Sequence, residues 1–271
     1  MTVDDLLSLP ALTETGHQRW QCNNLIIPKD WAQGRTAFGG ISAGMLYSAI
    51  RQRVSAERVL RSFTTNFIGP LAVDEPFSIE VTLLREGANV SQFIAQAMQN
   101  DRVCVMSQAC FGIARKSSVE VPNHERHDMA PPQKAKFIPQ IPKVTPKFLR
   151  HFDLAIDEGG VPFTRRKTSV YHGFMRFKKP PASINDAHII TMIDAWPPTL
   201  LQMMKLPAPA STVSWNLEFV HPHKPVAPDD WFAYKAHTRH AADGYGHTEA
   251  TIWDKDNEVI ALSRQTVAIF D

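Results

Sequence analysis

The chain has 271 residues, 44% of them hydrophobic and 21% charged, and a formal net charge of +2. A chain of this length and composition can bury one large core or two cores of ordinary size. Its 29 basic and 27 acidic residues nearly balance, which excludes a dedicated nucleic-acid or membrane-surface binder but leaves room for a local contact with an anionic ligand.

The first residues and the cysteines bear on where the protein works. The opening MTVDDLLSLP carries two acids where a signal peptide needs positive charge, and no apolar run approaches the length that spans a bilayer. Cys22, Cys104 and Cys110 are too few for a disulfide framework and show no CxxC spacing. We therefore expect a cytoplasmic protein with reduced thiols and no membrane insertion.

The first half of the chain predicts one helix among several strands. A strand is expected at 20–27, and the turn AFGG then leads into a helix at 41–56 whose apolar residues share one face. Strand-like runs bounded by Gly, Pro, Asn or Asp follow at 59–68, 76–86, 90–100 and 102–114.

A proline-rich stretch comes next. Residues 116–165 contain seven prolines, a density that blocks long helices and the interior of sheets. We expect this stretch to be an inter-domain connection that runs over the surface.

The second half repeats the order of the first. A strand at 168–177 precedes a helix at 186–196, for which Asp186 is the expected N-cap. Strand-like runs follow at 212–220, 231–240, 245–253 and 258–270. Short matches link the halves: NFIGP with LEFVHP, DEPF with DDWF, and QNDRVCVMS with KDNEVIALS. The sequence thus indicates an internal duplication.

The repeated order predicts an α+β fold in which two antiparallel sheets are each wrapped around a central helix. The short turns between the last strands favour antiparallel pairing. The expected organisation is a domain at 1–115, the connection at 116–165 and a domain at 166–271. A β-sandwich is the competing fold, but it does not explain a helix at the same point of both halves.

These runs also resemble a known family. GRTAFGGISAGMLYSAI, LRSFTTNFIGPL and LLREGANVSQFIAQAMQNDRVCVMSQACFG resemble the first half of the acyl-CoA thioesterase II family, and IDAW, TVSWNLEFVHP and DNEVIALSRQTV are similar to its second half. The resemblance implies a tandem double-hotdog fold, hydrolysis of acyl-CoA to fatty acid and CoA, and no metal or other cofactor. It also leads us to expect a homo-oligomer.

The resemblance carries three catalytic residues onto this chain. The family's aspartate matches Asp194 in MIDAW, its threonine matches Thr212 in STVSW, and its glutamine matches Gln265 in LSRQTV. Ile193 stands where the family often has serine. Asp194 would be the general base for a water that Thr212 and Gln265 hold by hydrogen bonds.

A second part of the predicted site would bind the carbonyl oxygen of the substrate. The helix that begins near Gly39 and Gly40 offers backbone N–H groups without obstruction by side chains, so both glycines are candidate substrate-binding residues. The first half has no acid at the place of Asp194 and has Ala109 against Gln265. We therefore expect only the second half to be catalytic.

Structural explanations compete with these roles. Asp194 is also a plausible turn residue before Pro197. Strict alternation places Thr212 on one face with Ser214, Asn216 and Glu218, which is expected to be solvated. It places Gln265 with Ala261, Ser263 and Val267 on a face of small or apolar side chains, where an amide is more notable.

Other functions remain open at this point. His237 and His240 suggest a metal, but on a regular strand they point to opposite faces. An enoyl-thioester hydratase or dehydratase on the same fold would need a histidine paired with the acid, and His188 lies six positions before Asp194. The third possibility is a non-catalytic module that binds acyl thioesters.

Overall fold

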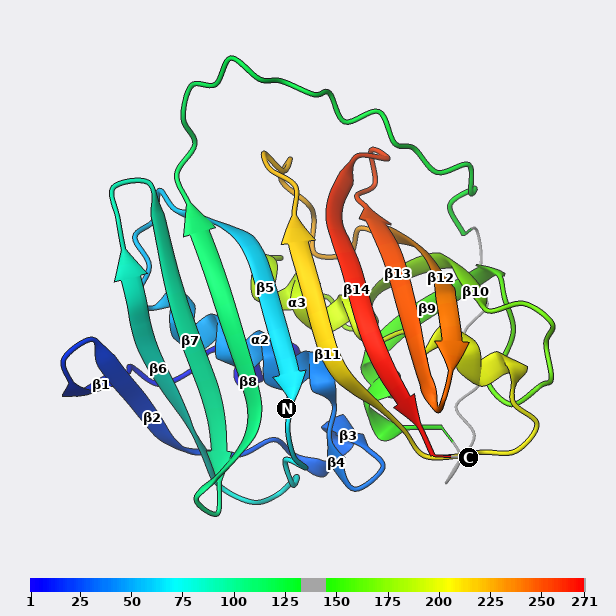
Figure 1. The fold of residues 1–271 in the computed structure, drawn as a ribbon, viewed down its shortest axis with the longest axis horizontal. Helices are drawn as coiled ribbons and strands as arrows, with labels where there is room; N and C mark the ends of the chain where they lie inside the picture. The colour runs from blue at the N-terminus through cyan, green and yellow to red at the C-terminus, as the bar shows by residue number, and fades with distance from the viewer. Residues whose placement is uncertain (133–144, 271) are drawn as a thin grey trace. The chain divides into compact units, whose positions relative to one another are not determined.

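The computed structural model describes residues 1–132 and 145–270, which form two compact units (Figure 1). Unit 1 comprises Met1–Pro122, Pro146–Phe148 and Ile184–Thr191. Unit 2 comprises Leu149–Ser183, Met192–Asp271 and Asn123–Thr145, apart from the residues that are not described. The domain boundaries at 115 and 166 stay a prediction, and the prolines at 139 and 142 of the expected connection lie outside the described residues.

Unit 1 contains an antiparallel sheet with one long helix against it. Its strands follow the order β1 (Thr13–Gly16), β2 (Arg19–Leu25), β6 (Phe77–Glu86), β7 (Val90–Gln99), β8 (Arg102–Gly112) and β5 (Val59–Phe67). Smaller elements are α1 (Val3–Leu7), η1 (Lys29–Trp31), β3 (Ala32–Gln33) and β4 (Thr36–Ala37). The helix α2 (Gly39–Arg51) lies across one face of β6, β7 and β8 (Figure 1).

The helix α2 is buried along almost its whole length because it packs on the sheet on one side and on another helix on the other. That second helix is α3 (Asp186–Ile193), most of which belongs to unit 1. A Cβ added to Gly40 would lie 2.6 Å from the carbonyl oxygen of Thr191, and one added to Gly44 would lie 2.3 Å from Thr191 Oγ1. Glycine at these positions is therefore required by the close approach of the two helices.

The N-cap of α3 differs from the sequence prediction. The side-chain oxygen of Asn185 accepts hydrogen bonds from the N–H groups of Ala187 (3.0 Å) and His188 (3.4 Å). Asp186 is the first residue of the helix, and its carboxylate accepts a hydrogen bond from the Tyr47 hydroxyl at 2.8 Å. The prediction of an Asp186 cap was wrong by one residue, since Asn and Asp are equally good caps and sequence alone does not choose between neighbours.

Unit 2 repeats the antiparallel design. Its strands follow the order β11 (Ala210–Phe219), β14 (Val259–Ile269), β13 (Tyr245–Trp253), β12 (Phe232–Ala242), β10 (Val170–Phe177) and β9 (Phe152–Glu158). Two 3₁₀ helices, η2 (Lys147–His151) and η3 (Thr199–Met203), complete the described elements. The strand β9 comes from the proline-rich stretch and is the last strand in the order. Proline-rich sequence is tolerated at the edge of a sheet.

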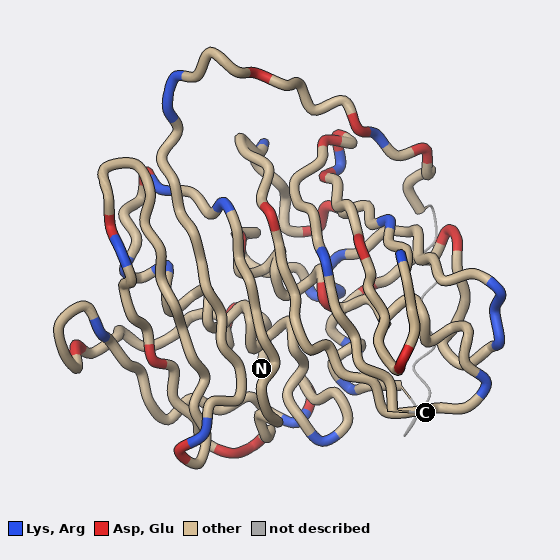
Figure 2. The backbone as a smooth tube through the Cα atoms, viewed as in Figure 1, with Lys and Arg blue, Asp and Glu red and all other residues tan. Residues whose placement is uncertain are grey.

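Most strands and both long helices agree with the sequence prediction, and a large antiparallel sheet content with few helices confirms the α+β class. Positions of Lys and Arg are interspersed with positions of Asp and Glu along the backbone of both units (Figure 2). None of the described helices is long and apolar enough to cross a membrane.

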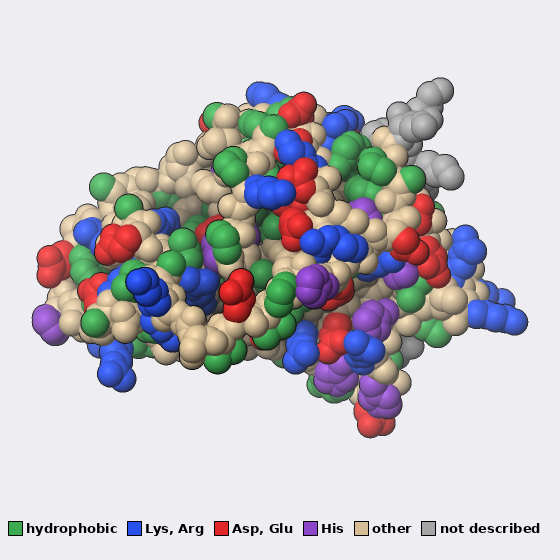
Figure 3. Space-filling view, turned by 90° about the horizontal axis from the view of Figure 1, so that it is seen from above, with side chains coloured by type: hydrophobic (Ala, Val, Ile, Leu, Met, Phe, Trp, Pro, Cys, Tyr) green, Lys and Arg blue, Asp and Glu red, His purple; other side chains and the backbone are tan. Residues whose placement is uncertain are grey.

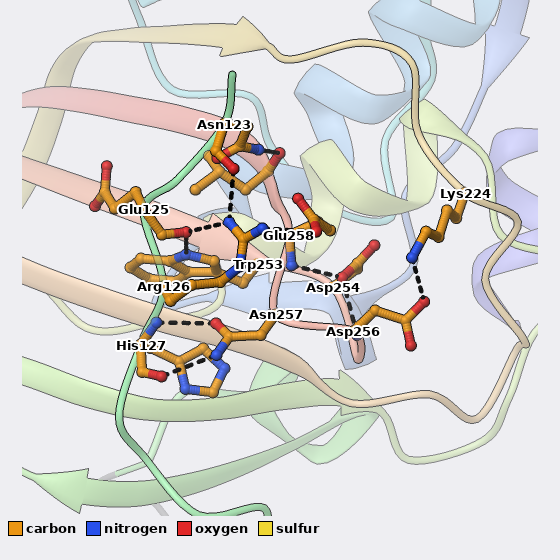
Figure 4. Close-up of polar contacts among 11 residues, drawn as sticks. Asn123, Glu125, Arg126, His127, Lys224, Trp253, Asp254, Asp256, Asn257 and Glu258 are labelled. Atoms are coloured by element: carbon orange, nitrogen blue, oxygen red, sulfur yellow. Dashed lines mark hydrogen bonds and ion pairs between the residues drawn. The ribbon is translucent and has the colours of Figure 1, made fainter. Parts of the chain in front are cut away.

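A strap of residues 123–129, from the proline-rich stretch, is held against the sheet of unit 2 (Figure 4). The Asn257 side chain accepts a hydrogen bond from the His127 N–H and donates one to the His127 carbonyl, both at 2.9 Å. Asn123 donates to the Val259 carbonyl at 3.1 Å, and Arg126 forms a 2.8 Å ion pair with Glu258. Hydrogen bonds to both sides of one residue's backbone fix the strap in a single register.

The strap covers an apolar patch on the sheet. Met129 packs in a buried cluster with Ala155, Phe174, Ala233, Trp253 and Val259. The His127 ring lies edge-on to Phe174 and Trp253, with centroids 5.6 and 5.5 Å away. Residues 123–129 thus run along the sheet, whereas Phe152–Ala155 of the same proline-rich stretch are buried in β9. Burial of the patch explains why the strap stays there.

We expect docking of the strap to weaken as the pH falls. Burial lowers the pKa of His127 below its ordinary value of 6.5, with Lys235 contributing. A released strap takes up a proton more readily than the docked one, so docking is strongest at neutral pH and is lost progressively below pH 6.5. The rate of hydrogen exchange of residues 123–129, corrected for the intrinsic pH dependence of the amides, should rise as the pH falls from about 7.5 to about 5.5.

The variant His127→Phe is the control for this pH effect. It keeps an aromatic ring between Phe174 and Trp253 but removes the titrating group, so its exchange should follow only the intrinsic pH dependence of the amides. Identical corrected exchange of the wild-type strap at both pH values would contradict the expectation.

Candidate active site

Asp194 lies in the turn that follows α3, after its last residue Ile193. Its side chain is half-buried, between the fully buried Ile193 and Ala195. The helix ends here because Pro197 and Pro198 cannot continue it, and Pro198 then begins η3 as its N-cap. A carboxylate at the C-terminal end of a helix is disfavoured by the helix dipole, so a stabilising cap does not explain the acid.

Gln265 contacts this acid directly. Its side-chain Nε2 donates a hydrogen bond to Asp194 Oδ1 at 2.9 Å, and both residues belong to unit 2. As the alternation predicts, Gln265 shares its face of β14 with the buried Ala261, Ser263 and Val267. The amide therefore fixes one carboxylate oxygen and leaves its own Oε1 as an acceptor.

Thr212 lies on the face opposite to the one predicted. The pairing of β11 with β14 shifts between Thr212 and Ser214, so that Val213 is an extra residue without a partner. Trp215 faces Gln265 and Thr212 faces Val267 across the strands, and directly paired residues share a face. The bulge thus moves Thr212 from the solvated face to the side of Gln265.

Buried aromatic side chains pack around Gln265 and Asp194. Trp215 is 1% exposed and donates from its indole to Ser263 Oγ at 2.9 Å. Trp196, two positions after the acid, stacks on Tyr234 with centroids 5.1 Å apart and planes at 4°. A Cβ on Gly173 would lie 2.1 Å from the Ala155 carbonyl oxygen and 2.9 Å from the Trp196 ring, so both the neighbouring strand and this ring require glycine there.

The negative charge of Asp194 affects the pKa of the buried Tyr234. Burial raises the pKa of the Tyr234 hydroxyl, and the nearby negative charge of Asp194 raises it further. Tyr234 is therefore a neutral hydroxyl at physiological pH. The arrangement combines one oriented carboxylate, an amide, a threonine and a rigid aromatic support, which suits activation of a water molecule by a general base.

Gly39 and Gly40, the predicted substrate-binding residues, form the first turn of α2 in unit 1. The cap residue Phe38 makes no side-chain cap hydrogen bond, and the first N–H groups of a helix have no partner within the helix. Their role as donors to a substrate stays a prediction. Gly40 also has the packing role against Thr191 described above.

The histidines of β12 do not keep the faces that strict alternation predicts. The register of β12 shifts between Thr238 and His240, so His240 pairs with His247 while His237 pairs with Glu249. The prediction of opposite faces for His237 and His240 was wrong, because Arg239 is the extra residue of a bulge. Several histidines lie among acidic and basic side chains on the face that Figure 3 shows, yet no group of three or more potential ligands within the described residues could hold a metal.

His188 is engaged away from Asp194. Its Nδ1 lies 2.9 Å from Asn185 Oδ1, and its Nε2 lies 3.0 Å from Asp4 Oδ1. Burial lowers its pKa, and the hydrogen bond to Asp4 raises it in part. A histidine held by these two partners offers no support for a hydratase pair with Asp194.

Family models match both halves of the chain. The acyl-CoA thioesterase N-terminal domain matches residues 27–112, and the acyl-CoA thioesterase C-terminal domain matches residues 124–269. The second match includes most of the strap. The chain is also 25% identical to acyl-CoA thioesterase 2 of Haemophilus influenzae over 256 residues, covering 85% of this chain and 86% of that protein.

Solved structures share the fold. A hot dog fold protein of unknown function from Alicyclobacillus acidocaldarius has a TM-score of 0.79 at 21% identity, covering 99% of this chain and 98% of its own. A tesB protein of Mycobacterium avium subspecies paratuberculosis has a TM-score of 0.75 at 18% identity, with 100% of both chains covered. The hotdog fold is thereby shown for the chain.

Proposed function

The chain belongs to the acyl-CoA thioesterase family and is a thioesterase, and we propose that it hydrolyses acyl-CoA at Asp194, assisted by Thr212 and Gln265. The observation that carries the residue assignment is the 2.9 Å hydrogen bond from Gln265 to Asp194. It joins two residues 71 positions apart in the chain, and Gln265 shares its strand face with the buried Ala261, Ser263 and Val267.

The reaction needs one proton acceptor. Asp194 takes a proton from water as the water oxygen attacks the thioester carbonyl carbon, and the tetrahedral intermediate collapses with cleavage of the C–S bond. A thiolate is a good leaving group, so the proton held by Asp194 can pass to it or to solvent. The negative oxygen of the intermediate would be stabilised by N–H groups such as those of Gly39 and Gly40.

In this proposal Gln265 and Thr212 position the water by hydrogen bonds. Gln265 holds Asp194 Oδ1 and so orients the carboxylate that receives the proton, and the Oε1 of Gln265 accepts a hydrogen bond from the water. Thr212 adds a hydroxyl from the adjacent strand on the same face. A water with two acceptors and one donor around it has one lone pair left for attack.

The proposal extends to the organisation of the protein. Each half of the duplication would contribute one antiparallel sheet and one helix to the double hotdog, and only the second half would be catalytic. We further propose a cytoplasmic homo-oligomer that acts on acyl-CoA without a cofactor. The family match, the repeated strand order and the acid in one half alone support this.

The test of the function is release of free thiol from a panel of acyl-CoAs, from acetyl to palmitoyl, by the wild-type protein. Hydrolysis of at least part of the panel is expected. Absence of thiol release with every chain length would overturn the proposal and favour a binding module.

Thr212→Val should lower kcat on the best substrate about 100-fold, since a poorly placed water reacts about 10²-fold more slowly. The substitution conserves shape, so KM and stability should change little. The matched control is Ser214→Ala, which removes a hydroxyl from the opposite face of the same strand and should leave kcat unchanged. Equal loss in both variants would argue against the bulge as the feature that places Thr212.

A further inference from the structure

Unit 1 contains an open cleft of about 560 Å³ between the C-terminal half of α2 and the start of α3. Its lining includes Leu7, Leu9, Tyr47, Ser48, Arg51 and Asp186. Sites for small ligands commonly measure about 300–1,000 Å³ and combine apolar walls with a few polar groups. The cleft has both properties, and none of these residues takes part in the proposed hydrolysis.

The internal duplication relates this cleft to the proposed catalytic position. Asp194 stands eight positions after the first residue of α3, and Tyr47 stands eight positions after the first residue of α2. The close approach of Gly40 to Thr191, and of Gly44 to both Thr191 and Ala187, shows that α2 and α3 run antiparallel. The end of one helix therefore lies beside the start of the other, and the cleft is the counterpart of the Asp194 site in the other repeat.

The cleft has no carboxylate at the position equivalent to Asp194. Tyr47 replaces the acid, and its hydroxyl donates to Asp186 Oδ2 at 2.8 Å. Burial and the adjacent Asp186 raise its pKa, so Tyr47 stays neutral and is no base. The N–H groups of Ala187 and His188 at the start of α3 are already bonded to Asn185 Oδ1. A ligand in the cleft would be bound without being cleaved.

The polar groups of the cleft indicate the ligand. Arg51 donates to the carbonyls of Val54, Ser55 and Ala56, at 3.3, 3.1 and 3.5 Å, and forms no ion pair with an acid in the described part of the chain. Its charge is thus available to a phosphate. Asp186 and Ser48 offer acceptors and a donor beside the apolar Leu7 and Leu9, a mixture that suits a chain of amides and methylenes.

We propose that the cleft of unit 1 is a second, non-hydrolytic site for coenzyme A or its esters, with the pantetheine arm along the cleft and a phosphate at Arg51. The inference rests on the proposed function only in its choice of ligand.

The experiment uses the whole chain and coenzyme A itself. Hydrogen exchange with and without coenzyme A should show slower exchange of residues 47–52 and 184–187 in the wild type. Ser48→Trp fills the cleft, so the protection of these segments should disappear while thiol release at low acyl-CoA concentration stays at the wild-type rate. In Asp194→Asn, which retains the cleft, the protection should persist.

The outcomes separate the two proposals. Unchanged exchange of both segments at saturating coenzyme A overturns the second site, whether or not the enzyme hydrolyses acyl-CoA. Protection that persists in Ser48→Trp also overturns it, because the ligand would then bind elsewhere. Should Ser48→Trp fail to fold, the exchange data on the wild type and on Asp194→Asn decide the matter. Absence of hydrolysis by the wild type refutes the proposed function alone.

Discussion

Asp194→Asn is expected to lower kcat for acyl-CoA hydrolysis by roughly 10²- to 10⁴-fold, the contribution typical of a general base. The substitution keeps the size of the side chain, and the remaining carbonyl oxygen can still accept the hydrogen bond from Gln265. KM and thermal stability should therefore stay close to those of the wild type. The measurement is release of free thiol under saturating and limiting substrate.

The matched control is Asp186→Asn, at the other end of the same helix. It removes a carboxylate of similar exposure that accepts a hydrogen bond from Tyr47, and it should leave kcat unchanged. Turnover by Asp194→Asn equal to that of the wild type would remove Asp194 as the base. A parallel loss in both variants would indicate damage to α3 instead of loss of a catalytic group.

Trp253→Ala is expected to lower the free energy of unfolding by about 3–5 kcal/mol, the usual cost of truncating a buried tryptophan. Trp253 is 2% exposed, contacts the His127 ring and donates to the Glu125 carbonyl at 3.2 Å. Its removal creates a cavity under the strap and also removes the contacts that hold the strap. Urea denaturation should show a lower midpoint, and exchange of residues 123–129 should rise.

Trp253→Phe separates the two effects. It keeps an aromatic ring in the apolar cluster but loses the hydrogen bond to Glu125, which is worth about 1 kcal/mol, so its stability should fall much less. A loss below about 1 kcal/mol in Trp253→Ala would show that the strap and the cluster contribute little to unit 2.

Alternation of apolar and polar residues was a good guide to the strands, because one face of each strand is buried. It located β5 to β8 and β10 to β14 to within a few residues, and it placed Gln265 correctly on the buried face. It failed at Thr212 and at His240 for one reason. A bulge at Val213 and another at Arg239 each add a residue to one strand, which inverts the face of everything beyond it.

The bulges have no clear signature in the sequence, since Val213 and Arg239 are ordinary strand residues. The N-cap of α3 was equally hard to predict, because Asn185 and Asp186 are both suitable caps. Asp186 instead accepts a hydrogen bond from Tyr47, 139 positions away. The strap was expected on the surface, but its register depends on Asn257, a turn residue whose side-chain amide bonds to a distant backbone.

The sequence by itself determined the repeated order of strands and helices, the antiparallel pairing and the residue types of the site, because periodicity and composition are properties of short segments. Only the tertiary structure decided that Gln265 bonds to Asp194, that Thr212 shares the face of Gln265, and that α2 and α3 enclose a cleft in which Tyr47 stands at the position equivalent to Asp194. These facts depend on register and on helix packing, which bring together residues far apart in the chain and which no short segment specifies.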